Sequence, residues 1–142
     1  MSVRFHQLVN IRLEKRNDLK LFISDMFSKN GHKIFELDII FCDDSYLLDI
    51  NRRFLKHDYY TDIITFNLTE KGKYMCAEIY ISKDMVLENA KNQQVSFRNE
   101  IHRVIFHGVL HLLGYDDETA VKKSEMRKME DAWLKKYFRQ TS

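Results

Sequence analysis

The chain has 142 residues, of which 44% are hydrophobic and 31% charged, a composition typical of one soluble globular domain with a substantial core. Its net charge of +2 allows an RNA partner without requiring one. No stretch approaches the roughly 20 apolar residues that cross a bilayer, and residues 1–14 lack the apolar segment of a signal peptide, which excludes a membrane protein and predicts a cytoplasmic one.

The first half of the chain alternates between strand-like and helix-like patterns. In chain order, we expect a strand, a helix, a strand and a helix at residues 3–13, 15–29, 35–42 and 45–54. Asp43 or Asp44 provides the N-cap of the second helix. No repeat, low-complexity tract or linker interrupts the sequence, so we expect a single domain over residues 1–142.

The second half predicts a β-hairpin followed by three helices. The hairpin has strands at 61–68 and 74–81 with a turn at 70–73, and the helices span 82–94, 96–113 and 119–138. The order β-α-β-α-β-β-α-α-α predicts an α/β (or α+β) fold, with a mixed sheet of about four strands covered by helices. The helix over 96–113 is apolar on nearly all sides, so we expect it at the centre.

His107 and His111 lie four residues apart on this apolar helix, and therefore on the same face. The pair alone is weak evidence, because six histidines produce this spacing readily by chance. Two buried imidazoles are costly unless both are satisfied, however, and a shared metal ion satisfies both. Gly114 then ends the helix and Asp117 follows, which gives the spacing logic of zincin-type metal sites.

The identity of the third ligand is open, because it lies in an acidic run. Asp117 fits the spacing best, with Asp116 or a water as the alternatives, and the acids could instead cap the final helix. Gly108 stands where a metalloprotease carries its glutamate base, which disfavours a peptidase. We expect His102 on another face of the helix, outside the site.

Three segments resemble the signature blocks of the YbeY family, in the family's order. Residues 107–116 read HGVLHLLGYD, like the family's HGxLHLxGYDH; residues 61–66 read TDIITF, like T-[DN]-V-L-[ST]-F; and residues 77–82 read AEIYIS, like G-D-I-x-I-S. The likeness covers nearly the whole chain. It implies an α/β domain with a four-stranded sheet and one metal ion, usually zinc, in an endoribonuclease that processes the 3′ end of small-subunit rRNA and assists ribosome quality control.

The chain departs from the family pattern at several positions. The family's third histidine falls at Asp117, its arginine of the second block at Leu55, and the glycine and aspartate of its third block at Ala77 and Glu78. Two histidines and an aspartate still leave a position open for water. A carboxylate ligand raises the pKa of the bound water and widens the choice of metal toward harder ions such as Mn²⁺, so Zn²⁺ stays the first choice.

Basic residues near Leu55 are candidates for the missing phosphate contact. Arg53 and Lys56 are the best substitutes, although a solvated helix end explains them as well. The final helix also carries many cations interleaved with Glu125, Glu130 and Asp131, and this pattern favours a solvated face over an RNA track.

Taken together, these features predict a metal-dependent endoribonuclease with His107, His111 and Asp117 as ligands. We expect it to act as a monomer on single-stranded rRNA of the small ribosomal subunit. Two alternatives stay open: a non-catalytic ribosome-assembly factor with a structural metal site, and a small metal-dependent hydrolase of another substrate.

Overall fold

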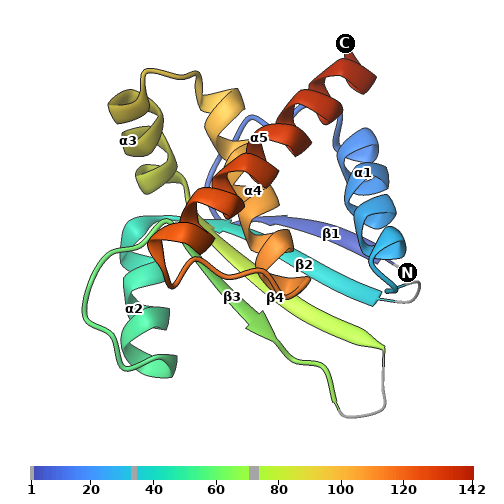
Figure 1. The fold of residues 1–142 in the computed structure, drawn as a ribbon. Helices are drawn as coiled ribbons and strands as arrows, with labels where there is room; N and C mark the ends of the chain where they lie inside the picture. Colours follow the sequence, from blue (N-terminus) through green and yellow to red (C-terminus); the bar gives the residue numbers. More distant parts are fainter. Residues whose placement is uncertain (1, 33–34, 71–73) are drawn as a thin grey trace.

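The computed structural model describes residues 2–32, 35–70 and 74–142, and within these ranges five helices cover a four-stranded mixed sheet (Figure 1). The strands are β1 (Ser2–Gln7), β2 (Phe35–Cys42), β3 (Ile63–Asn67) and β4 (Met75–Ser82). The helices are α1 (Arg16–Lys29), α2 (Asp44–Phe54), α3 (Lys83–Gln93), α4 (Phe97–Leu112) and α5 (Ala120–Thr141). The predicted element order and fold class are confirmed. The turn expected at 70–73 lies largely outside the described residues.

The strands lie in the order β1-β2-β4-β3. β1, β2 and β4 are parallel, with Phe5 beside Ile39 and Ile39 beside Ile79. β3 runs antiparallel to β4, as the predicted hairpin requires, and forms the edge of the sheet with Thr65 beside Ile79. The hairpin therefore puts β4 between β2 and β3, and β4 becomes an interior strand.

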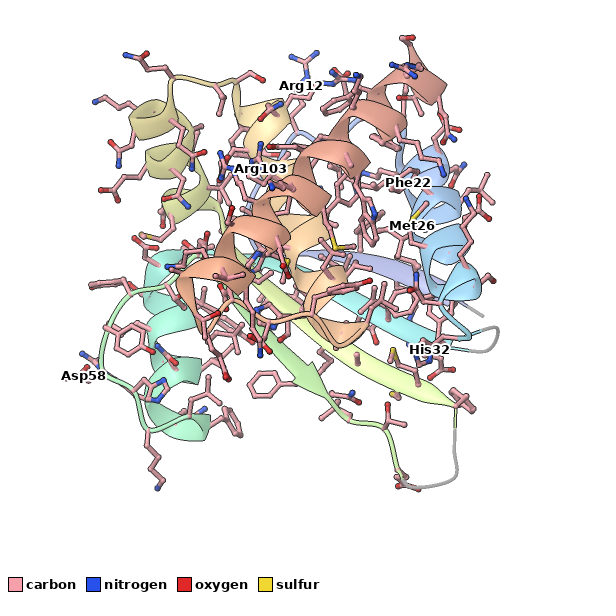
Figure 2. The ribbon with its side chains drawn as sticks, in the orientation of Figure 1. Arg12, Phe22, Met26, His32, Asp58 and Arg103 are labelled. Atoms are coloured by element: carbon pink, nitrogen blue, oxygen red, sulfur yellow. The ribbon has the colours of Figure 1, made fainter. Side chains whose placement is uncertain are left out.

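The two faces of the sheet are covered unequally. Side chains that alternate along β2 and β4 form the main core together with α1, α4 and α5, where Phe22 and Met26 line the inner face of α1 (Figure 2). On the other face, α2 packs Leu47 and Ile50 against Ile64 in a smaller cluster. The fully buried middle of α4 lies in the main core, as the sequence predicts.

Helix α4 packs closely against the sheet at Gly108. A Cβ atom at this position would lie 2.8 Å from Ile63 Cδ1 and 3.0 Å from Ile79 Cδ1, so a side chain there would force these isoleucine side chains to shift. Gly108 stands where a metalloprotease carries its glutamate. In this structure it faces the hairpin strands, and the close packing there favours a residue without a side chain.

The predicted first strand, residues 3–13, is wrong in its second half. β1 ends at Gln7 because its partner ends: Gln7 lies beside Phe41, and β2 finishes one residue later. The chain then leaves the sheet, although Ile11 and Leu13 remain buried in the core, and their burial explains the apolar pattern. At the other end of the chain, α5 continues to Thr141 instead of stopping at Phe138.

His102 lies among aromatic rings, on a face of α4 away from the histidine pair. Its side chain stacks on Tyr137 with ring centroids 5.2 Å apart, and its Nδ1 is 2.6 Å from the carbonyl oxygen of Arg98. The residue is 3% exposed, and this desolvation lowers its pKa to about 4. His102 is therefore a neutral core residue.

The buried His102 should make folding stability depend on pH. Its pKa lies near 6.5 in the unfolded chain and about 4 in the fold, so acidification protonates the unfolded state first and the free energy of unfolding falls as the pH drops below 6.5. We expect His102→Phe to reduce the loss of stability between pH 7 and pH 4.5 by about 2 kcal/mol, measured by urea denaturation. An unchanged pH dependence in the variant would contradict this assignment.

Candidate metal centre

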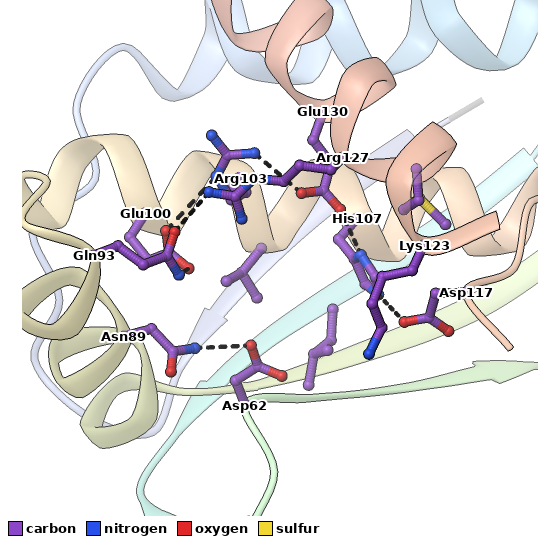
Figure 3. A pocket seen from close by; sticks show the side chains of 13 residues that line it. Asp62, Asn89, Gln93, Glu100, Arg103, His107, Asp117, Lys123, Arg127 and Glu130 are labelled. Atoms are coloured by element: carbon purple, nitrogen blue, oxygen red, sulfur yellow. Dashed lines mark hydrogen bonds and ion pairs between the residues drawn. The ribbon is translucent and has the colours of Figure 1, made fainter. Parts of the chain in front are cut away.

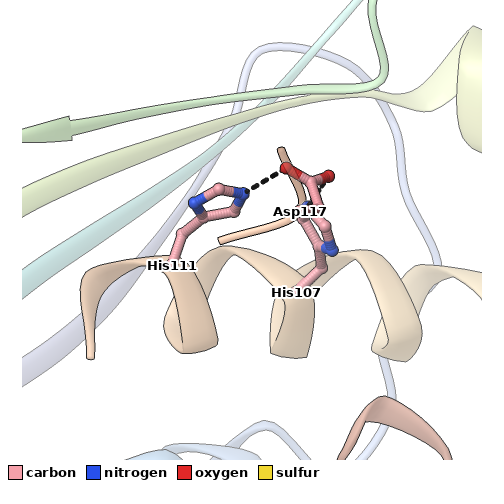
Figure 4. Close-up of side chains that lie close together, drawn as sticks. All are labelled: His107, His111 and Asp117. Carbon is pink, nitrogen blue, oxygen red and sulfur yellow. Dashed lines mark ion pairs between the residues drawn. The ribbon is translucent and has the colours of Figure 1, made fainter. Parts of the chain in front are cut away.

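Helix α4 and the turn after it bring three predicted ligands together. Asp117 Oδ2 lies 3.7 Å from His107 Nε2, and Asp117 Oδ1 lies 3.5 Å from His111 Nε2 (Figure 4). The two histidines project from successive turns of α4, and one ligand atom from each of the three residues lies within 4.8 Å of the others. The three side chains that the spacing predicts as ligands therefore lie side by side.

A left-handed glycine returns the chain to the histidines. Gly114 has φ +103°, and the amide of Tyr115 donates to the carbonyl of Leu110 at 3.1 Å while that of Gly114 donates to His111 at 3.0 Å. These bonds form a Schellman-type helix end, which satisfies the last carbonyl groups of α4. The reversal directs residues 115–117 back along the helix, and so positions the carboxylate of Asp117.

The distances among the ligand atoms suit a metal ion. Tetrahedral coordination with bonds of about 2.1 Å places ligand atoms roughly 3.4 Å apart. The histidine nitrogens lie 3.7 and 3.5 Å from different oxygens of Asp117, and with one ligand atom per residue the three atoms lie within 4.8 Å, so the cluster is slightly wider than an ion would require. All three side chains are partly exposed, so the cluster is open to solvent. Two imidazoles and one carboxylate carry a single formal charge of −1, which suits a divalent cation.

A buried carboxylate on α5 fixes the orientation of His107. Glu130 Oε2 lies 2.6 Å from His107 Nδ1, and Glu130 is 5% exposed. Burial alone lowers the pKa of His107, but the hydrogen bond and the charge of Glu130 outweigh it, and the pKa is raised. Because Nδ1 donates to Glu130 in the neutral ring, the lone pair of Nε2 points toward Asp117, the arrangement that a metal ligand needs.

Arg103 completes this network between α4 and α5. Its guanidinium donates to Glu130 at 3.1 Å, and its Nε lies 3.7 Å from Glu100 (Figure 3). The guanidinium also donates to Asp131 at 2.7 Å. Glu130 thus has partners on both oxygens, which offsets the cost of burying its charge.

The sequence analysis missed Glu130 and placed it on a solvated face, which is wrong. Glu130 lies on the buried stripe of α5 together with Met126, Leu134 and Tyr137. The sequence did contain a signal for the burial of Glu130, because this acid occurs at helical spacing among the apolar residues of one stripe. Such a residue needs a buried partner, but the sequence does not reveal which one.

A polar cleft with a volume of about 300 Å³ opens beside His107 and Asp117. Its lining comes from β3, α3, α4 and α5 and includes Asp62, Asn89, Lys123 and Arg127 (Figure 3). Asn89 donates to Asp62 at 3.0 Å, and burial raises the pKa of Asp62 above its ordinary value. The cleft is large enough for an extended polar ligand next to the ligand cluster.

Arg53 and Lys56, the predicted phosphate contacts, do not line this cleft. Arg53 lies on α2, 3.6 Å from Asp49, and borders a separate hollow with Phe66 and Tyr80. Lys56 follows the end of α2 in a left-handed conformation. The cations of α5 that do line the cleft, Lys123 and Arg127, belong to the set that the sequence assigned to a solvated face.

Comparisons with known proteins agree with the signature blocks. A sequence model described as endoribonuclease YbeY matches residues 7–138. A protein of Cytophaga hutchinsonii named endoribonuclease YbeY is 46% identical over 92% of this chain and 91% of its own length, and one of Amoebophilus asiaticus with the same name is 38% identical over 92% and 88%. The solution structure of a Thermotoga maritima protein superposes with a TM-score of 0.66 at 25% identity, covering 98% of this chain and 91% of that one.

The link from Glu130 to His107 predicts a specific loss of metal affinity. Glu130→Gln keeps the shape and one acceptor for Arg103 but removes the charge that holds the His107 ring. We expect the affinity for Zn²⁺ to fall about 10- to 100-fold, measured by competition with a chromogenic chelator. Glu125→Gln, on the exposed side of the same helix, is the matched control. Equal affinities in the two variants would contradict the role of Glu130.

Proposed function

The chain belongs to the YbeY endoribonuclease family, and from this premise we propose that it is a metal-dependent enzyme that cleaves single-stranded RNA. Its substrate is the rRNA of the small ribosomal subunit near the 3′ end, and its role is rRNA maturation and ribosome quality control. The observation that carries the proposal is the convergence of His107, His111 and Asp117 at one side of a polar cleft. Residues 1–142 form one YbeY-like domain in this proposal.

The donor set favours one divalent ion, with Zn²⁺ as the first choice and harder ions such as Mn²⁺ next. When bound, the ion supplies Lewis acidity for phosphodiester hydrolysis. His107 and His111 would hold it through their Nε2 atoms, with Asp117 as the third ligand, and Glu130 would keep the His107 ring in place. Asp62 lies across the cleft from His107, and its raised pKa makes it a stronger base than a solvated aspartate, suited to accept a proton from the attacking water.

A second function is favoured by the departures from the family pattern. Leu55 stands where the family has an arginine, and Asp117 where it has a histidine. Both changes fit a ribosome-assembly factor whose metal is structural. A peptidase has less support, because Gly108 faces the sheet where a metalloprotease carries its glutamate base. The glutamate that contacts His107, Glu130, is buried and paired with Arg103. No helix in the described ranges is long and apolar enough to span a membrane. Because the proposed substrate is ribosomal, we also propose that the protein acts in the cytoplasm, and that it does so as a monomer.

Loss of one ligand should remove both metal and cleavage. We expect the purified protein to contain one divalent ion per chain by elemental analysis, and His111→Ala to lose that ion and at least 100-fold in cleavage of a single-stranded RNA oligonucleotide. Asp116→Asn is the control, since Asp116 pairs with Lys122 at 3.2 Å and lies outside the ligand cluster.

Three outcomes would count against the proposal in different ways. A wild-type protein without stoichiometric metal would overturn the metal centre itself. A metal-loaded protein that binds RNA without cutting it would favour the assembly factor. Cleavage that survives His111→Ala would point to a contaminating nuclease.

Arg53 and Lys56 stay proposed contacts for the RNA backbone, away from the metal centre. We expect the double variant Arg53→Ala/Lys56→Ala to weaken RNA binding several-fold, with cleavage at saturating RNA and metal content unchanged, because the two cations lie outside the cleft. Fluorescence anisotropy and single-turnover cleavage measure the two effects. If both binding and cleavage match the wild type, the two residues have no role in RNA recognition.

A further inference from the structure

We propose that Lys123 and Arg127 of α5 form a phosphate-binding subsite of the cleft and hold the backbone of single-stranded RNA beside the metal centre. This inference rests on the proposed RNA-cleaving function and deepens it. It assigns the RNA contact nearest to the metal to a pair of residues on the helix that also supplies Glu130.

The position of the two side chains carries the first part of the argument. They lie four residues apart, on one face of α5, and both line the cleft that also contains His107 and Asp117. Figure 3 shows them reaching from α5 into this opening. A phosphodiester bound between them would therefore lie next to the ligand cluster.

The charge of these two cations is available to a ligand. Arg127 donates to Gln93 Oε1 at 2.7 Å, a neutral acceptor that holds the side chain over the cleft. Its charge also acts on the carboxylate of Glu100, but the two groups form no ion pair in the described ranges. Lys123 forms no side-chain hydrogen bond or ion pair with any residue in the described ranges. Arg103, the third cation of the cleft, is committed to Glu130 and Asp131.

The charges around the cleft explain why such cations are needed. Asp62, Glu100, Asp117 and Glu130 all line it, and they would repel an RNA backbone. Lys123 and Arg127 provide positive charge on the α5 side. The ammonium attracts a phosphate from several directions, while the guanidinium can hold two of its oxygens at once.

The test compares two double variants with the same change of charge on the same helix. Lys123→Ala/Arg127→Ala removes the subsite, and Lys128→Ala/Lys135→Ala removes two exposed cations of α5 that do not line the cleft. Binding of a single-stranded 2′-O-methyl phosphorothioate RNA to the metal-loaded proteins is measured by anisotropy over a range of KCl concentrations. Metal content and Tm verify that each variant is folded and loaded.

We expect the cleft variant to bind about tenfold more weakly, and the slope of log affinity against log salt to become about 0.7 shallower, the value for one single-strand phosphate contact. The control should change affinity less than twofold, and Lys123→Arg should bind like the wild type. Equal slopes for the two double variants would overturn the subsite, while cleavage by the wild type would leave the proposed function intact. A loaded wild-type protein that neither binds nor cleaves RNA would overturn both.

Discussion

The close packing of α4 between the sheet and α5 determines where the side chains of the candidate metal centre lie. Gly108 lets the helix approach β3 and β4 on one side, and Phe106 packs against Trp133 and Tyr137 of α5 on the other. Held on both sides, α4 has little freedom to rotate. The two histidines at its end therefore point in one fixed direction, and His107 lines the cleft.

The buried acid on α5 links this packing to the chemistry. Glu130 accepts from Arg103 and lies against His107, so one carboxylate joins two helices and sets the orientation of a metal ligand. Removing a single member of such a network leaves an unpaired buried charge, which is costly. Stability and the proposed metal binding would therefore depend on the same few side chains, and a change at one of them is expected to affect both.

The features that could be predicted from the sequence are those that depend on the spacing of residues close together in the chain. The element order followed from periodicity, and the meeting of His107, His111 and Asp117 followed from the helical repeat and from the glycine that reverses the chain. Features that depend on the packing of distant segments were not predictable in this way. The end of β1 depends on the length of β2, and the partner of Glu130 lies 23 residues earlier in the chain.

Because the chain reverses at Gly114, the three proposed ligands lie on two segments that differ in rigidity. His107 and His111 belong to a rigid helix, whereas Asp117 lies on the segment that links α4 to α5. For the metal centre proposed above, the helix would supply a preformed pair of nitrogens, and the linking segment would supply the third ligand from outside the core. Substitutions between Gly114 and α5 would then change how long an ion stays bound while leaving the packing of the fold intact.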